Sequence, residues 1–283
     1  MEGNRNIGKG ARRMKVVIVC ILSFMAIFQF FPLFWLTDFS LSTSGMVNSG
    51  RILVWPSPFQ WINYVDAWNR GHIPSYLLNS VIVTGGSIVL TLFAAATASY
   101  AFTRMRWKLN KLVYVLSIIG MMIPLHATLL PNYIVCNQLG LINTYFALII
   151  NYSARSIPFA IMVMCAFLES VPFSLEESAV IDGAGIYRII FSIILPLTMS
   201  AMMTVGISQF MGAWNDFIMA LTFITKDTLR TLPFSVQQFK AVYGADYAKQ
   251  FAVMVISTIP MIVIYIAFNE RITKGIMLGA VKA

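Results

Sequence analysis

The residues with the clearest capacity for chemistry lie in one polar stretch, from Glu169 to Pro196, set between long apolar segments. Six positions in it form the pattern E-x-A-x3-G-x9-I-x-L-P: Glu177, Ala179, Gly183, Ile193, Leu195 and Pro196. A chain that is otherwise so apolar rarely keeps a compact, charged stretch in its middle unless a partner binds there. The stretch therefore indicates docking of a partner rather than catalysis.

Local signals in this stretch predict two short helices joined by a tight turn. Ser174 stands three residues before Glu177, the S-x-x-E pattern of a capping box, so we expect a helix to begin at Leu175. Glycine permits the left-handed conformation that ends a helix, and Asp182-Gly183 is the expected break. The second helix is expected to contain Ile186, Ile190 and Ile194 and to run to Pro196, which suits the first turn of the next helix.

A rigid protrusion of this kind can fit a groove on a partner and transmit force. The competing interpretation is an ordinary connecting loop, because a lone S-x-x-E and a lone Asp-Gly are common in such loops. The six positions at fixed spacings favour the docking interpretation.

Catalytic and metal-binding constellations are not apparent in the sequence. Cys20, Cys136 and Cys165 are far apart and lie in or near apolar stretches, so we interpret them as packing residues. His72 and His126 lie in different parts of the chain, which argues against a histidine metal site. We expect no catalytic residue, no metal ligand and no cofactor bound by this chain.

The composition is that of an integral membrane protein. Of the 283 residues, 58% are hydrophobic and 11% are charged, whereas a soluble domain carries about 25% charged residues. The apolar segments are continuous rather than alternating, so helices are the expected spanning element. The net charge of +9 is interpreted as a topology signal in such a chain, and we expect no nucleic-acid partner.

Spanning the hydrocarbon core takes about 20 apolar residues, and six segments are long enough. The expected fold is therefore an all-α membrane protein with six transmembrane helices. Their approximate ranges are 15–36, 75–103, 109–130, 142–167, 197–222 and 250–269. The basic start followed by an apolar run is interpreted as a retained first helix, because no small-residue cleavage site follows.

The distribution of Lys and Arg predicts the orientation of these helices. The first end, the 104–111 turn, the 168–196 loop and the last end hold five, four, one and three basic residues, against six on the opposite side. This bias predicts that both termini and the polar 169–196 loop are cytoplasmic. On the other side, 37–74 is expected to be an external element with interfacial aromatics, and 223–249 to hold a short interfacial or re-entrant helix.

The 169–196 pattern resembles the coupling loop, or EAA loop, of the membrane-spanning subunits of ABC importers. Other segments resemble the MalG-like carbohydrate-importing permeases: Leu78-Asn79-Ser80, Ala98 to Arg104, Met122-Ile123-Pro124, Gly140 to Thr144, Trp214 to Phe217, and Gly279 to Ala283. The resemblance implies the ABC type I importer permease (MetI-like) fold. It implies an N-terminal helix and external segment over 1–72, a core over 73–270 and a cytoplasmic tail over 271–283.

This resemblance also implies partners. They are a second, homologous permease subunit in a heterodimer, two ATP-binding subunits that hold ATP and Mg, and an extracytoplasmic solute-binding protein that delivers a sugar. Membrane lipid surrounds the assembly, which would be multi-pass in a bacterial or archaeal inner or plasma membrane. The chain has no G-x4-G-K-[ST] loop, so we expect it to be a transporter subunit and not an enzyme. The tail is expected either to reach between the ATPase subunits or to fray.

By the same resemblance, Glu177 would pair with a basic residue of the ATPase, Ala179 would allow close approach and Gly183 would make the turn. Ser178 replaces the usual alanine of the family. The residues expected to couple to the ATPase are Ser174, Glu177, Ser178, Ala179, Asp182, Gly183, Ala184, Ile193, Leu195 and Pro196.

Polar residues inside spanning segments are costly and usually face a cavity, so they are candidates for the substrate path. These are Asn151, Arg155, Gln209, Trp214, Asn215 and Asp216. Trp214 could stack on a sugar face, and Arg155 would suit an acidic sugar. The alternatives are an ion pair between Arg155 and Asp216, and interhelical hydrogen bonds from Asn151 and Gln209.

Three further functions compete with a sugar permease. An ABC importer for a polyol phosphate, polyamine or amino acid would use the same loop. A membrane-embedded enzyme would need convergent acids or histidines, and Asp216 is the only acid expected deep in a helix. A stand-alone channel or secondary carrier would need no coupling loop, and no inverted halves are evident.

Overall fold

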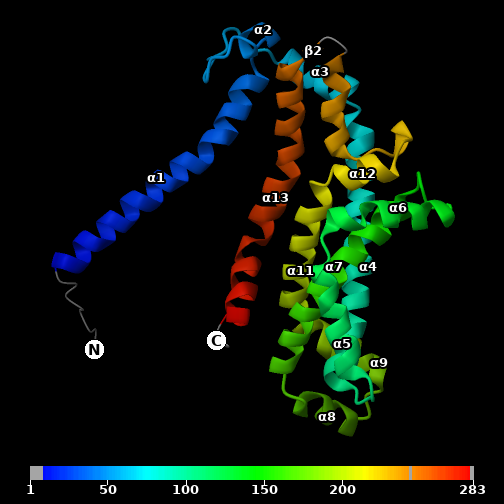
Figure 1. Cartoon of the computed structure of the whole chain (residues 1–283). Helices are drawn as coiled ribbons and strands as arrows, with labels where there is room; N and C mark the ends of the chain where they lie inside the picture. The colour runs from blue at the N-terminus through cyan, green and yellow to red at the C-terminus, as the bar shows by residue number, and fades with distance from the viewer. Residues whose placement is uncertain (1–8, 242–243, 281–283) are drawn as a thin grey trace. The chain divides into compact units, whose positions relative to one another are not determined.

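A computed structural model of the chain describes residues 9–241 and 244–280 (Figure 1). Helices dominate the described residues. They form two compact units: one contains the residues up to Gly71 together with Val236–Ile256, and the other contains His72–Ser235 together with the residues from Ser257 onward.

The first unit contains the long helix α1 (Lys9–Ser40) and the short helices α2 (Ser44–Val47) and α3 (Ile62–Arg70). Asn63 on α3 donates hydrogen bonds of 2.9 Å to the carbonyls of Ser40 and Ser42, which fixes α3 against the end of α1. Lys249 bridges Asp66 at 2.8 Å and Asp246 at 3.0 Å.

The same unit contains a short antiparallel pair, β1 (Lys240–Ala241) and β2 (Gly244–Ala245), in which Lys240 faces Ala245. It also contains the first part of α13 (Tyr247–Ala280).

The second unit is built on α4 (Ile73–Arg104), α7 (Tyr145–Ser170) and α11 (Met199–Trp214), which pack side by side (Figure 1). The buried face of α4 carries small side chains at helical spacing: Ser80, Thr84, Ser87, Thr91, Ala95 and Ser99. Small residues let helix backbones approach closely in a membrane. Ser153 on α7 uses this proximity, since its hydroxyl donates to the Ser87 carbonyl at 3.1 Å.

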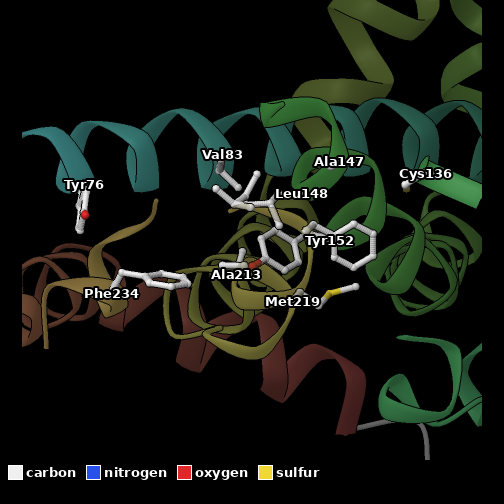
Figure 2. Packing of buried hydrophobic residues seen from close by; sticks show 12 residues of the cluster. Tyr76, Val83, Cys136, Ala147, Leu148, Tyr152, Ala213, Met219 and Phe234 are labelled. Atoms are coloured by element: carbon white, nitrogen blue, oxygen red, sulfur yellow. The ribbon is translucent and has the colours of Figure 1, made fainter. Parts of the chain in front are cut away.

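A cluster of apolar side chains fills one region of this unit (Figure 2). Leu148 and Tyr152 of α7 gather there with Ala213 of α11 and with Met219 of α12 (Ile218–Phe223). Through this cluster, the residues on both sides of the break between α11 and α12 pack against α7.

One expected span is bent, and a second bend lies where the 169–196 loop meets the next helix. The 109–130 span is α5 (Asn110–Ile119) and η1 (Gly120–Met122), followed after a break by η2 (Leu125–Thr128) and α6 (Leu129–Gln138). The two halves differ in direction by 98°. Ile123 is extended, as a residue before proline prefers to be, and Pro124 therefore ends the first half.

The second bend separates Ile186–Leu197 from Met199–Trp214 by 68°. The expected 197–222 span is also shorter than predicted, because α11 stops at Trp214 and α12 is a separate helix. Among residues 9–241 and 244–280, four helices are long and apolar enough to cross a membrane, or up to six spans if each bent pair counts as one.

The 223–249 segment contains η4 (Asp227–Leu229) and η5 (Leu232–Phe239), so the short helix expected there is of the 3-10 type. Asn79 holds part of it by donating to the carbonyls of Thr228 at 2.9 Å and Arg230 at 2.8 Å. Ser80 accepts the Leu232 N–H at 2.8 Å. The Leu78-Asn79-Ser80 motif therefore anchors this loop to the start of α4.

Candidate coupling site and membrane path

The first helix of the 169–196 loop, α8 (Ser174–Ile181), begins one residue earlier than predicted. Its N-cap is Phe173, and no side chain caps it, so the predicted capping box between Ser174 and Glu177 is wrong. Phe173 already has helical backbone angles, which places Ser174 inside the helix rather than at its boundary. The side chain of Glu177 is exposed and available to a partner.

The predicted turn at Asp182-Gly183 is confirmed. Gly183 has φ +78°, the left-handed conformation that glycine adopts at least cost. The Gly183 N–H donates to the Val180 carbonyl at 3.0 Å, and the Ala184 N–H donates to the Ala179 carbonyl at 2.9 Å. This pair of bonds is a Schellman motif, which satisfies carbonyls that the end of α8 would otherwise leave unbonded.

The second helical stretch consists of α9 (Ile186–Ile189), the π-helix η3 (Ile190–Ile194) and α10 (Leu195–Leu197), with Pro196 in the first turn of α10. The predicted helix up to Pro196 is confirmed, and it contains a π turn. Ile189 and Ile194 are buried, five residues apart, whereas Ile186 is exposed. The wide π turn explains this spacing, because its bonds join residues five apart.

An apolar cluster attaches the loop to the bundle. Its buried members are Leu168, Ala179, Ile189 and Ile194, with Tyr100, Ala184 and Ile193 packed around them. Ala179 is 8% exposed and Ala184 is half-buried, so both face this chain's own helices. The small residues of the pattern let α8 lie close to the ends of α4 and α7.

A buried ion pair strengthens this attachment. Arg104 Nε lies 2.6 Å from Glu176 Oε1, and the side chains are 9% and 6% exposed. The contact is an ion pair rather than an aligned hydrogen bond. Tyr100 donates to the other carboxylate oxygen at 3.2 Å.

Arg104 also binds the end of α7. Its Nη2 donates to the carbonyls of Leu168 at 3.0 Å and Val171 at 2.9 Å. One side chain at the end of α4 therefore holds both α7 and α8.

Sequence reasoning missed Glu176 because the pattern drew attention to Glu177. Helical spacing could have separated the two acids, since Glu176 shares a face with Ala179, three residues later. If Ala179 faces the bundle, Glu176 faces it too and Glu177 does not.

The outer side of the loop exposes large apolar groups. Ile181 is 85% exposed and Tyr187 is 76% exposed. Others that are exposed there are Phe173, Leu175, Val180, Ile186 and Phe191. Apolar groups gathered on a surface mark an interaction site. We call Leu175, Glu177, Ser178, Ile181 and Tyr187 the outer face of the loop.

Two of the path candidates are bonded within the bundle. Asn151 donates to the Ala147 carbonyl at 2.7 Å and to Cys136 Sγ at 3.3 Å. Gln209 donates to Ser87 Oγ at 3.1 Å and to the Tyr152 carbonyl at 3.2 Å, and accepts from the Ser156 hydroxyl. In this structure both residues make the interhelical contacts of the alternative interpretation.

Trp214 has no ring face open for stacking, contrary to the expectation for a sugar contact. It is 4% exposed and stacks on Phe210 with ring centroids 5.2 Å apart. Asn215 is exposed and donates to the Met211 carbonyl of its own helix at 3.1 Å.

Asp216 does not lie deep in a helix as predicted. It lies in the break between α11 and α12, where its Oδ1 accepts the Met219 N–H at 2.9 Å and the Tyr152 hydroxyl at 3.0 Å. It forms no ion pair with Arg155 among the described residues, so that predicted pair is absent here.

Two cavities in the second unit, of about 310 and 460 Å³, are lined mainly by apolar side chains. The larger lies against α4, α7 and η3, with Phe93, Met164 and Phe191 in its wall. Neither cavity offers the array of hydrogen-bonding groups that a sugar requires. The described residues also contain no group of His, Cys, Asp or Glu that could hold a metal ion.

Residues 87–277 match the family model of binding-protein-dependent transport system inner membrane components. The chain belongs to this family. The match covers most of the bundle, the 169–196 loop and most of α13, and the family consists of membrane transport subunits rather than enzymes.

The relatives that the chain matches over most of its length are named as permease proteins. The chain is 39% identical over 252 residues to the putative ABC transporter permease protein ORF2 of Caldicellulosiruptor sp., covering 89% of this chain and 91% of the relative. It is 30% identical over 275 residues to the trehalose/maltose transport system permease protein MalG of Thermococcus litoralis, covering 96% and 97%. The resemblance to MalG-like carbohydrate permeases is thereby confirmed.

The fold is that of a solved importer. One chain of a bacterial ABC transporter involved in the import of the acidic polysaccharide alginate superposes with a TM-score of 0.82 at 20% identity, covering 93% of this chain and 98% of that chain. A chain of the alginate transporter in complex with a pentasaccharide-bound periplasmic protein gives a TM-score of 0.66 at 17% identity.

Proposed function

We propose that this chain is the permease subunit of an ATP-driven, binding-protein-dependent importer of sugars or oligosaccharides. It forms half of the translocation path in a bacterial or archaeal plasma membrane, with both termini in the cytoplasm. A second homologous permease forms the other half, two ATP-binding subunits supply the work, and an extracytoplasmic binding protein delivers the solute.

The observation that carries this proposal is the way the 169–196 loop is attached to the bundle. The inner side of α8 is fixed by Ala179 and by the Glu176–Arg104 ion pair, while the outer face stays exposed. A rigid element with one anchored side and one free side can pass a displacement from a partner to the helices behind it. Glu177 provides the charge and Ile181 the apolar contact for that partner.

The expected C-terminal tail, 271–283, is described only up to Ala280. The helix α13 runs to Ala280, which means that most of the expected 271–283 tail is helical backbone. Val281, Lys282 and Ala283 lie outside the described residues. Contact of this end with the ATP-binding subunits remains part of the proposal.

Division of the path between two permeases is supported by the cavities described above. Because they are apolar, a sugar passing through this chain alone would lose its hydrogen bonds to water without replacement. A path completed by a second subunit avoids that cost. The substrate class follows the relatives, whose names include transporters of trehalose/maltose and of melibiose, raffinose and stachyose.

The alternative is an ABC importer for a polyol phosphate, polyamine or amino acid. The loop geometry would serve any of these equally, so uptake measurements with each solute class decide between them.

Site-directed crosslinking tests the docking role. In a cysteine-free complex that imports its solute, we expect Ile181→Cys and Tyr187→Cys to trap an ATP-binding subunit with a short bifunctional reagent. Leu139→Cys, exposed at the end of α6, is the matched control and should trap none. A working complex in which neither loop position ever captures an ATP-binding subunit would refute the docking role.

A further inference from the structure

The guanidinium of Arg155 has no counter-ion within the described part of the chain, although it lies near the middle of the spanning helix α7. Asp216, the acid expected to pair with it, is occupied by the Tyr152 hydroxyl and the Met219 N–H. A charge inside a membrane helix is costly, so such residues face a cavity or a partner that compensates them.

The guanidinium lies close to a glycine on the neighbouring helix. A Cβ on Gly212 of α11 would stand 3.0 Å from Arg155 Nη2. Any larger residue at this position would crowd the guanidinium, and glycine therefore lets the charge lie directly against α11.

Polar groups flank this charge. Ser208 and Asn215 lie about one turn before and after Gly212, on the same side of α11, and both are exposed. Together, Arg155, Ser208, Gly212 and Asn215 form what we call the polar strip. It offers a cation, a hydroxyl and an amide, and it contains no carboxylate.

We propose that Arg155 is an anion-binding residue of the translocation path and that it selects saccharides carrying an acidic group, such as a uronic acid. This inference rests on the proposed function. A guanidinium binds a carboxylate through two parallel hydrogen bonds, which fixes the orientation of the acidic sugar. Ser208 and Asn215 provide hydrogen bonds for the hydroxyls of the same ring.

A carboxylate of the second permease is the competing partner for Arg155. The polar strip favours the saccharide. The Ser208 hydroxyl and the Asn215 amide can bind sugar hydroxyls, whereas a protein carboxylate needs only the guanidinium of Arg155. The two possibilities differ in what the loss of the charge does. Removing it weakens acidic solute binding in one case and subunit association in the other.

The test uses the complete importer complex in nanodiscs, without the binding protein, and two disaccharides of the same linkage. One probe ends in glucuronic acid and the other is its neutral counterpart, at equal ionic strength. We expect the acidic probe to bind the wild-type complex with higher affinity than the neutral probe. Arg155→Gln should lower the affinity for the acidic probe by about tenfold to a hundredfold, the usual effect of losing a charged hydrogen bond. The affinity for the neutral probe should not change. Arg155→Lys should retain part of the preference, and Arg106→Gln, an exposed arginine outside the strip, should retain all of it.

The inference is overturned if the acidic probe has no advantage in the wild type, or if its advantage survives Arg155→Gln. It is also overturned if Arg155→Gln releases the second permease on size exclusion without changing the acidic preference. ATP turnover stimulated by the binding protein is measured in parallel. If it persists in a wild-type complex that shows no acidic preference, the importer assignment stands and only the role of Arg155 fails.

Discussion

Arg104, the last residue of α4, meets Glu176 on α8 through a buried contact of 2.6 Å. The same arginine donates to two carbonyls at the end of α7. The neighbouring acid, Glu177, points away from these contacts and is exposed. Glu176 therefore binds within the chain, whereas Glu177 is available to a partner. Substitutions can distinguish these two roles.

Removing the inner charge should destabilise the fold. Glu176→Gln leaves Arg104 buried without its counter-charge, and breaking a buried pair in this way costs roughly 3–5 kcal/mol. We expect a clearly lower melting temperature for the purified chain, without the ATP-binding subunits, by differential scanning fluorimetry. The matched control is Glu177→Gln, one residue away, which should melt as the wild type does. Equal melting of the two variants would show that the ion pair does not stabilise the loop.

Reversing the outer charge should affect coupling instead. Glu177→Lys keeps α8 intact, because this side chain makes no described contact with the bundle, so the protein should insert and fold normally. Transport in proteoliposomes should be abolished and the ATP-binding subunits should dissociate more readily on size exclusion. Glu169→Lys, exposed in the same loop but outside the pattern, is the control. Normal uptake by the Glu177 variant would contradict the coupling role.

The turn between α8 and α9 offers a glycine comparison. Gly183→Ala forces a side chain into the left-handed region at φ +78°, at a cost of about 1–2 kcal/mol. Gly185→Ala, two residues later, has φ −72° and free space around it, so it should be tolerated. Protease protection of the loop would report the difference. If both variants were equally resistant, the left-handed turn would not be a constraint.

The chain by itself should not turn over ATP. It contains no G-x4-G-K-[ST] loop, and hydrolysis is expected only after the ATP-binding subunits are added. A coupled-enzyme assay on the purified chain, before and after that addition, measures both states. Hydrolysis by the isolated chain, at the rate of the full complex, would refute the proposed division of labour.

The helical fold and the turn at Gly183 could be predicted because they depend on local signals. Apolar runs specify spans and an Asp-Gly pair specifies a break, whatever lies around them. The bend at Pro124 also has a local signal, the proline itself, although 109–130 is predicted as a single span. The capping box failed because Phe173 entered the helix first, which the S-x-x-E spacing does not exclude.

The inner contacts of the site could not be predicted in the same way. Arg104 and Glu176 are far apart in the sequence, and only the packing of α4 against the loop brings them together. Trp214 and Asp216 were misjudged for a related reason. The burial of Trp214 and the hydrogen bond that Tyr152 of α7 donates to Asp216 are properties of the tertiary structure rather than of the local sequence.

The π-helix at Ile190–Ile194 has a consequence for how this segment tolerates change. One additional residue in a turn rotates everything beyond it by about 100° relative to a regular α-helix. The faces presented by α9 and α10 are thus out of phase, and deleting a single residue from 190–194 would bring them back into phase. One of the two faces would then lose its present neighbours, so the number of residues in this stretch matters as much as their identity.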